Sequence, residues 1–294
     1  MTAKIIDGVA IACKTRVAIA ERARALAARG TPPALTVIIV GDNPASQIYV
    51  RNKVRACGEV GIDSEVVRLP ADIGESRLLD TIRKLNGNPR VHGILVQLPL
   101  PPHIAPRRVL ETISVAKDVD GFHLYNVGGL VIGETVFPPC TPYGVQKILE
   151  HEGIELEGKN VTVVGASNIV GKPLALMLMQ REATVAICHA KTRDLAQYTI
   201  LADILVVAAG QPNLIVAPMV RTGAVVIDVG INFLPGGKLV GDVDFEGVKQ
   251  KASYITPVPG GVGPMTVTML LENTVAAAER ACGVKPVPAE LGFA

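Results

Sequence analysis

The stretch Val161-Thr162-Val163-Val164-Gly165-Ala166-Ser167-Asn168-Ile169-Val170-Gly171-Lys172-Pro173 decides the fold of this chain. A β-branched apolar run ends in a glycine, a short polar loop follows, and Gly171 opens a run of helix-forming residues. This order predicts a strand, a tight turn and a helix, which together form the first unit of a doubly wound nucleotide-binding sheet. The free N–H groups at such a helix start suit a pyrophosphate. Because Ser167 stands where the usual G-x-G-x-x-G has its second glycine, a turn without a ligand stays an alternative at this point.

Length and composition indicate a globular chain of two domains. At 294 residues, 49% of them hydrophobic and 19% charged, the chain can build two cores. A net charge of +2 without a basic tail or stripe argues against a nucleic-acid partner. The five scattered cysteines form no C-x-x-C pair, which indicates reduced cytoplasmic thiols rather than disulfides or a zinc site. The sequence shows no apolar signal-peptide core and no membrane-spanning run of about 18 apolar residues.

The first half of the chain predicts a parallel sheet. Asn43 and Pro44 are typical of the start of a helix, and Gly61 of its end. Three strand–helix units in a row imply a three-layer α/β domain with loops gathered at the carboxyl ends of its strands. Helices and strands are expected over residues 7–29, 35–40, 44–61, 64–69, 75–85 and 91–96.

The second half predicts a Rossmann-like domain. Thr141 and Pro142 are expected to cap and start a connecting helix that runs to residue 152. We expect two domains with a cleft between them: a catalytic domain of residues 1–139, rejoined by a C-terminal helix in residues 265–294, and a dinucleotide-binding domain of residues 140–264. Residues 285–294 read as a loose tail. Further elements are expected over residues 161–165, 170–181, 184–188, 194–199, 203–208, 224–229, 234–240 (a hairpin), 253–256 and 265–282.

Four residues of the first domain could carry chemistry. Tyr49 and Lys53 are four residues apart and share one helix face, while Gln97 and Asp120 lie in loops at or after strand ends. The carboxyl ends of parallel strands converge on one crevice, where a partly desolvated lysine can transfer protons near neutral pH. Asp120 could accept hydrogen bonds from the amino groups of a heterocycle. Spacing alone leaves the alternative of a solvated lysine and a packing tyrosine, and the histidines show no metal-ligand spacing.

Six blocks of sequence add a resemblance to these patterns. They are YVRNK (49–53), VQLPLP (96–101), KDVDGF (117–122), PCTP (139–142), GASNIVG (165–171) and PVPGGVGPMT (257–266). Together they resemble the bifunctional methylenetetrahydrofolate dehydrogenase/cyclohydrolase family over nearly the whole chain. The resemblance implies that a hydride passes from 5,10-methylenetetrahydrofolate to an oxidised nicotinamide cofactor. Water then opens the methenyl cation to give 10-formyltetrahydrofolate, a step of one-carbon metabolism.

The resemblance also implies roles for single residues. Lys53 handles the protons of the hydrolytic step and Gln97 orients and tunes it. Asp120 grips the pterin ring, and Tyr49 packs against the aromatic system of the folate. Further positions that the resemblance assigns to the folate site are Val96, Leu98, Pro259, Gly260, Gly261 and Val262. Those that it assigns to the cofactor groove are Gly165, Ala166, Ser167, Ile231 and Thr141.

The segment after the second strand of the Rossmann-like domain predicts the choice of cofactor. An NAD site of this type has an acid there, whereas this chain reads CHAKTR with Lys191 and Arg193. A basic segment favours a 2′-phosphate and therefore NADP over NAD, unless these two side chains only cover a surface loop. The family resemblance favours NADP as well, although Ala166 and Ala190 stand where many relatives have side chains that can touch the phosphate. By resemblance only, the chain is also expected to form a homodimer.

Three other functions stay open from the sequence. A nucleotide-binding regulator of the same fold would have lost Lys53, Gln97 or Asp120, and all three are present. A monofunctional dehydrogenase of the same family is disfavoured by the intact pair of Lys53 and Gln97. An amino-acid or shikimate-type dehydrogenase of similar architecture lacks the block at residues 257–266.

Overall fold

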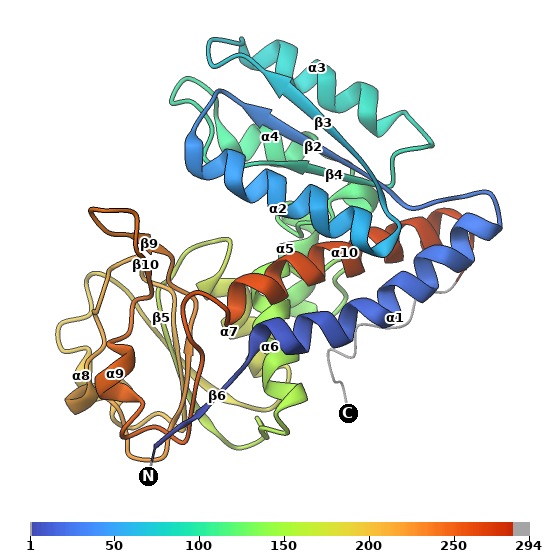
Figure 1. Ribbon diagram of the computed structural model, residues 1–294. Coiled ribbons are helices and arrows are strands. Elements are labelled where there is room, and N and C mark those ends of the chain that lie inside the picture. The colour runs from blue at the N-terminus through green and yellow to red at the C-terminus, as the bar shows by residue number, and fades with distance from the viewer. Residues whose placement is uncertain (1, 285–294) are drawn as a thin grey trace. The chain divides into compact units, whose positions relative to one another are not determined.

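The computed structural model describes residues 2–284, which divide into two compact units (Figure 1). Residues 14–140 and 267–284 form the three-stranded unit, and residues 2–13 and 141–266 form the six-stranded unit. The sequence placed residues 1–13 in the first domain, but β1 (Lys4–Ile5) pairs with β11 (Tyr254–Ile255) of the six-stranded unit. Residues 285–294 lie outside the described residues. They include the predicted loose tail and the last part of the segment predicted to rejoin the first domain.

The three-stranded unit is a parallel sheet between helices, as the sequence predicts. β2 (Ala34–Val40) lies between β3 (Asp63–Leu69) and β4 (Gly93–Val96), and both pairings are parallel. One face of the sheet packs against α3 (Glu75–Asn86) and α4 (Pro106–Thr112) in a cluster that includes Leu78, Ile82 and Val109. Figure 1 shows α2 (Pro44–Val60) on the opposite side of this sheet from α3. The three layers are therefore confirmed for this unit.

Local signals of the sequence place the helix ends here. The Asn43 side chain accepts a hydrogen bond from the Ser46 N–H at 3.1 Å, with Pro44 in the first turn of α2. Gly61 ends the helix in the left-handed conformation at φ 78°. Asp7 accepts from the Ala10 N–H at 3.0 Å and so caps α1 (Gly8–Ala28). The predicted start and end of α2 are therefore confirmed.

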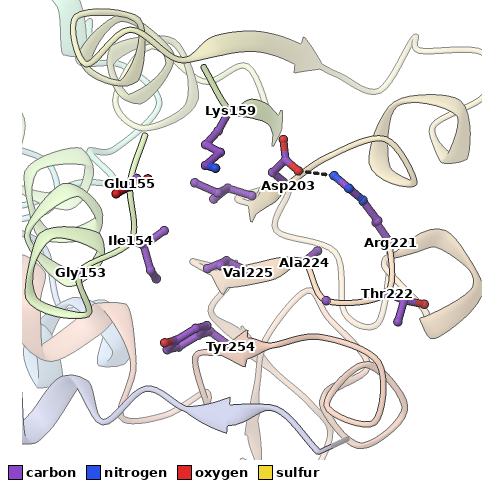
Figure 2. Close-up of a pocket in the computed structure, with 12 residues that line it drawn as sticks. Gly153, Ile154, Glu155, Lys159, Asp203, Arg221, Thr222, Ala224, Val225 and Tyr254 are labelled. Carbon is purple, nitrogen blue, oxygen red and sulfur yellow. Dashed lines mark hydrogen bonds and ion pairs between the residues drawn. The ribbon is translucent and has the colours of Figure 1, made fainter. Parts of the chain in front are cut away.

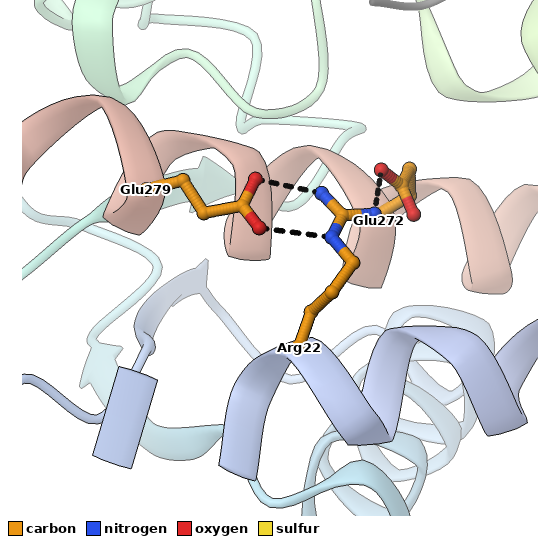
Figure 3. A network of polar contacts seen from close by, with 3 residues as sticks. All are labelled: Arg22, Glu272 and Glu279. Atoms are coloured by element: carbon orange, nitrogen blue, oxygen red, sulfur yellow. Dashed lines mark hydrogen bonds and ion pairs between the residues drawn. The ribbon is translucent and has the colours of Figure 1, made fainter. Parts of the chain in front are cut away.

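α1 and α10 (Val262–Ala281) lie side by side within the three-stranded unit. The Arg22 guanidinium binds Glu279 through two hydrogen bonds of 2.9 and 2.8 Å. It also donates to Glu272 at 2.5 Å (Figure 3). Burial lowers the pKa of Arg22, but the two carboxylates outweigh it and the net pKa is raised. A further hydrogen bond of 3.0 Å, from the Arg16 Nε to the Thr268 Oγ1, links the same two helices. The two helices are thus joined by a partly buried network of charged and polar groups.

The six-stranded unit is a parallel sheet in the order β1-β11-β8-β7-β5-β6. β5 (Asn160–Val164) has β6 (Thr184–Cys188) on one side and β7 (Ile204–Val207) on the other. The direction of winding reverses at β5, which is the switch point where doubly wound sheets bind ligands. α7 (Gly171–Met179) follows β5 directly, and β8 (Val225–Asp228) follows β7 in the sheet. The Rossmann-like prediction is confirmed.

Several elements differ from their predicted bounds. The connecting helix α6 (Cys140–His151) begins two residues before its predicted start at Pro142, so Thr141 lies inside the helix and not at its cap. α10 begins three residues before the predicted start, and α5 (Leu124–Ile132) is absent from the prediction because its Gly128-Gly129 pair disfavours a helix. The hairpin is confirmed as β9 (Asn232–Phe233) and β10 (Leu239–Val240). The remaining short helices are η1 (Val115–Lys117), α8 (Ala196–Thr199), η2 (Ala217–Met219) and α9 (Phe245–Val248).

None of the described helices combines the length and the apolar character that crossing a membrane requires.

Candidate active site

Lys53 and Gln97 meet in the three-stranded unit. Lys53 lies on α2 and Gln97 directly follows β4, so the parallel sheet brings residues 44 positions apart to one edge. The Lys53 Nζ donates to the Gln97 Oε1 at 3.1 Å. The Gln97 Nε2 in turn donates to the Leu98 carbonyl at 2.8 Å, which fixes the amide with its oxygen toward the lysine. Lys53 therefore donates to an uncharged amide oxygen, and Gln97 supplies no negative charge to the ammonium.

Asp120 completes the polar group around Lys53. Burial raises the pKa of the Asp120 carboxyl, while the Lys53 ammonium and a hydrogen bond from Cys140 lower it. Asp120 is half-buried and follows the short helix η1. An amide, an ammonium and a carboxylate thus come together, and they can orient a polar heterocycle and move protons at its edge.

The other predicted substrate residues of this unit lie beside the same edge. Tyr49 is half-buried one turn before Lys53, and burial raises the pKa of its hydroxyl. Val96 is buried as the last residue of β4, and Leu98 is half-buried after Gln97. Val96 therefore packs in the core while Tyr49 and Leu98 keep surface for a ligand.

Three residues that support Asp120 did not come out of the sequence analysis as site residues. The fully buried Cys140 donates from its Sγ to the Val119 carbonyl at 3.2 Å. The buried Asn273 donates to the same carbonyl at 2.9 Å and to Pro138 at 3.0 Å. Asp118 accepts from the His123 N–H at 2.8 Å. Burial and then the charge of Asp120 raise the pKa of the Cys140 thiol, which stays neutral. The two acids of the block KDVDGF could have marked Asp118 as a site residue. No sequence pattern marks Asn273, which lies on a helix far along the chain.

The turn after β5 in the six-stranded unit is closed by its own hydrogen bonds. Gly165 has a φ of +122°, and a Cβ there would collide with the Ala208 carbonyl. The Ser167 Oγ accepts from the Val170 N–H at 3.1 Å and from the Gly171 N–H at 3.4 Å, so this serine closes the turn. The Lys172 N–H donates to the Ser167 carbonyl at 3.1 Å, and Pro173 has no N–H. The first turn of α7 therefore has no free N–H group, and room for a cofactor comes instead from the close backbone approach at Gly165. Ala166 lies within the turn and adds no polar group.

The loop after β6 presents two cations. Lys191 and Arg193 are both exposed. The His189 Nδ1 accepts from the Lys191 N–H at 3.1 Å, and the His189 N–H donates to Thr192 Oγ1 at 3.0 Å. The loop backbone is therefore held by its own hydrogen bonds. Neither cationic head takes part in an ion pair within residues 2–284.

The remaining predicted positions also belong to the six-stranded unit. Ile231 is 42% exposed just after β8, and Thr141 shares a hydrogen bond of 3.2 Å with Thr266. Residues 259–262 run from the loop after β11 into α10, and a Cβ on Gly8 would meet the Gly261 carbonyl. The predicted site residues therefore fall into two groups, one in each unit.

Two family models match the chain. The model of the tetrahydrofolate dehydrogenase/cyclohydrolase catalytic domain matches residues 6–120, and that of the NAD(P)-binding domain of the same enzymes matches residues 139–282. The Bifunctional protein FolD of Nitrosospira multiformis is 62% identical over 281 residues, which cover 96% of this chain and 98% of that protein. The chain belongs to the tetrahydrofolate dehydrogenase/cyclohydrolase family.

Solved structures of the family have the same fold. The bifunctional FolD enzyme of Campylobacter jejuni is 54% identical, with a TM-score of 0.93 over 95% of this chain and 99% of that chain. The Trypanosoma brucei dehydrogenase-cyclohydrolase, complexed with NADP cofactor and inhibitor, is 40% identical, with a TM-score of 0.92 over 96% and 99% of the two chains.

One cavity of the six-stranded unit lies away from the cofactor turn of this family. It encloses about 380 Å³ between residues that include Lys159, Asp203, Arg221 and Tyr254 (Figure 2). These residues stand at the amino ends of the strands, where Asp203 and Arg221 form an ion pair. Ligands of doubly wound sheets bind at the carboxyl ends, so this cavity is separate from the cofactor groove.

Proposed function

We propose that this chain oxidises 5,10-methylenetetrahydrofolate with NADP and hydrolyses the resulting 5,10-methenyltetrahydrofolate to 10-formyltetrahydrofolate. The contact between Lys53 and Gln97 beside Asp120 carries the proposal, because it places an amine that can transfer protons next to an acid that can bind a heterocycle. The glycine turn from Gly165 to Gly171 supports the redox half, because it follows β5 at the switch point of the sheet, where doubly wound sheets bind dinucleotides.

The residues act differently in the two steps. NADP, when bound, supplies the acceptor for the hydride that leaves the methylene carbon with its electron pair, and the folate becomes a cation. Water then adds to that carbon, gives up a proton, and one carbon–nitrogen bond breaks. Lys53 moves the proton, Gln97 holds Lys53, Asp120 anchors the pterin and Tyr49 covers the aromatic system. The cation is electrophilic already, so positioning and proton transfer suffice without a strong nucleophile.

A spectrophotometric assay tests this function directly. The chain is given methylenetetrahydrofolate with NADP or NAD, and the reduced cofactor and the methenyl absorbance are followed together. The proposal expects reduced NADP with methenyltetrahydrofolate that appears and is consumed. A methenyl product that is never hydrolysed would indicate a monofunctional dehydrogenase, and no cofactor reduction would indicate an inactive regulator.

The preference for NADP is expected to depend on Lys191 and Arg193. Ala166 and Ala190 carry no group for the 2′-phosphate, whereas these two exposed cations follow β6 and are free to bind it. Replacing both with alanine is expected to erode the NADP preference by about 1–3 kcal/mol, the scale of charge-assisted hydrogen bonds. The measurement is the ratio of kcat/KM values for NADP and NAD. Lys238→Ala, an exposed lysine of the hairpin, is the matched control, and an unchanged ratio in the double variant would remove the assignment.

The assembly is proposed to be a homodimer in the cytoplasm. β6 pairs only with β5 among the described strands, and Tyr198, Ile200 and Leu201 expose apolar surface in the neighbouring helix and loop. An open edge beside apolar surface is typical of a contact between chains. The five cysteines are free, as a reducing compartment favours. Sedimentation at micromolar concentration tests the dimer, and a monomer mass would contradict it.

A further inference from the structure

Two buried acids lie beneath the carboxyl edge of the six-stranded sheet. Asp242 is fully buried and Asp228 is 3% exposed. Within residues 2–284 neither forms an ion pair, and both are held by hydrogen-bond donors alone. Buried carboxylates without a cation are costly and need a reason for their presence.

Asp242 joins the loops that follow two different strands. Its Oδ2 accepts from the Ala209 N–H at 2.6 Å and from the Gly210 N–H at 2.9 Å, just after β7. Its Oδ1 accepts from the Asn232 Nδ2 at 2.8 Å, at the end of the segment that follows β8. Ala209, Gly210 and Ile231 are themselves exposed. A buried carboxylate therefore holds exposed backbone from beneath.

Asp228 holds Asp242 in place. Its Oδ1 accepts from the Gly230 N–H at 2.9 Å and from the Asp242 N–H at 3.0 Å, and its Oδ2 accepts from the Val243 N–H at 3.0 Å. A Cβ on Gly241 would collide with the Asp228 Oδ2, so glycine is needed for this close approach. The two acids thus form one cluster, with Asp228 binding the backbone that carries Asp242.

The ionisation of Asp228 costs stability at neutral pH. Burial raises the pKa of this carboxyl to about 6. Its three N–H donors lower the pKa in part, and the charge of Asp242 raises it. Because the unfolded chain ionises the group more easily, the folded state binds the proton more tightly between the two pKa values. The free energy of unfolding that this group contributes therefore falls as the pH rises toward 6, and above that pH it falls no further. A group that is kept at such a cost is typical of a functional site.

The strand order says which part of the cofactor these loops face. β5 is the switch point; Lys191 and Arg193 follow β6 on one side of it, and the loops held by Asp242 follow β7 and β8 on the other side. A dinucleotide spans the switch point with one nucleotide on each side. If the basic loop binds the adenosine 2′-phosphate, the nicotinamide half lies over residues 208–210 and 230–232. The Ala208 carbonyl also lies against Gly165 of the turn after β5.

We propose that Asp242 is a positioning residue for hydride transfer, which holds residues 209–210 and 230–232 in the shape that receives the nicotinamide half of the cofactor. This inference rests on the proposed cofactor groove. Asp242 does not touch the reacting atoms; it acts through the backbone of Ala209 and Gly210 and through Asn232. The cyclohydrolase reaction needs no hydride acceptor and is predicted to be independent of it.

The test measures both activities in Asp242 variants. Asp242→Ala removes all three acceptor contacts, and we expect kcat of the dehydrogenase at saturating NADP to fall at least about 10-fold, because small misplacements of reacting groups are costly. The KM for NADP is expected to rise less than kcat falls, since the phosphate contacts remain. Hydrolysis of added methenyltetrahydrofolate is expected to stay at the wild-type rate. Asp244→Asn is the matched control, because Asp244 only caps α9 through the Gly247 N–H and should leave both activities unchanged.

A swapped pair keeps the test sharp if the alanine variant folds poorly. Asp242→Asn places an amide NH₂ against the Asn232 NH₂, whereas adding Asn232→Asp restores a donor facing an acceptor with the same net charge. We expect the double variant to recover most of the kcat that Asp242→Asn loses. Equal loss of both activities in Asp242→Ala, or dehydrogenase kinetics like the wild type in every variant, would overturn the inference. A wild-type chain that does not reduce NADP would instead overturn the proposed function.

Discussion

Lys53→Met is expected to reduce cyclohydrolase activity at least about 100-fold, the low end for general acid–base catalysis, while measurable dehydrogenase activity remains. Methionine keeps the unbranched stem of lysine but cannot donate to Gln97 or transfer a proton. Hydride transfer asks no protein group to take a proton, so it survives when the folate is still held. Methenyltetrahydrofolate should therefore accumulate in the coupled assay while reduced NADP still forms.

A control and two outcomes decide the role of Lys53. Arg51→Met removes an exposed cation two residues away on the same helix, and both activities should match the wild type. If Lys53→Met lost both activities equally while still binding folate, Lys53 would be a positioning residue for both steps. Full cyclohydrolase activity in this variant would show that another group moves the proton.

The pH dependence of substrate binding is a second readout of Lys53→Met. Burial raises the pKa of Asp120 and the Lys53 ammonium lowers it, so removal of the ammonium leaves burial less opposed and the pKa rises further. The carboxylate is then lost at a higher pH than in the wild type. The dehydrogenase KM for the folate should begin to rise earlier as the solution is acidified. An identical pH profile in both proteins would show that Asp120 does not sense Lys53.

Local signals explain which parts of the fold the sequence predicts. Asn43, Pro44 and Gly61 act within one helix, so their own side chains and conformations suffice to place its ends. The meeting of Lys53 and Gln97 follows from a general property of parallel sheets, whose strand ends share one edge. Both predictions needed only neighbours in sequence or a rule of topology.

The missed features depend on partners far away in the chain. β1 has only two residues and exists because it pairs with β11, which is about 250 residues later. Asn273 supports the Asp120 loop from a helix that is 154 residues from its partner Val119. Asp242 reads as one acid in a polar loop until the fold places Ala209 and Asn232 around it. No periodicity or spacing in a single sequence carries such contacts.

Arg22→Met is expected to lower the free energy of unfolding by about 3 kcal/mol, the low end for breaking a buried ion pair. The change leaves two carboxylates of α10 without their cation, and the side chain of Glu279 is only 8% exposed (Figure 3). Arg22→Lys keeps the charge but not the two parallel hydrogen bonds to Glu279, so an intermediate loss is expected. Chemical denaturation followed by circular dichroism measures both.

A double-variant cycle separates the interaction energy of Arg22 and Glu279 from the cost of leaving a carboxylate without its cation. Replacing Glu279 as well, in Arg22→Met with Glu279→Gln, removes the more buried of the two unpaired acids, so part of the stability should return. Arg83→Met is the control, because Arg83 and Asp80 form an exposed pair on α3 whose loss should cost at most about 0.5 kcal/mol. If Arg22→Met were no more destabilising than Arg83→Met, the network would contribute nothing to the contact between α1 and α10. If the double variant were as unstable as the sum of its single changes, Arg22 and Glu279 would contribute to stability independently of each other.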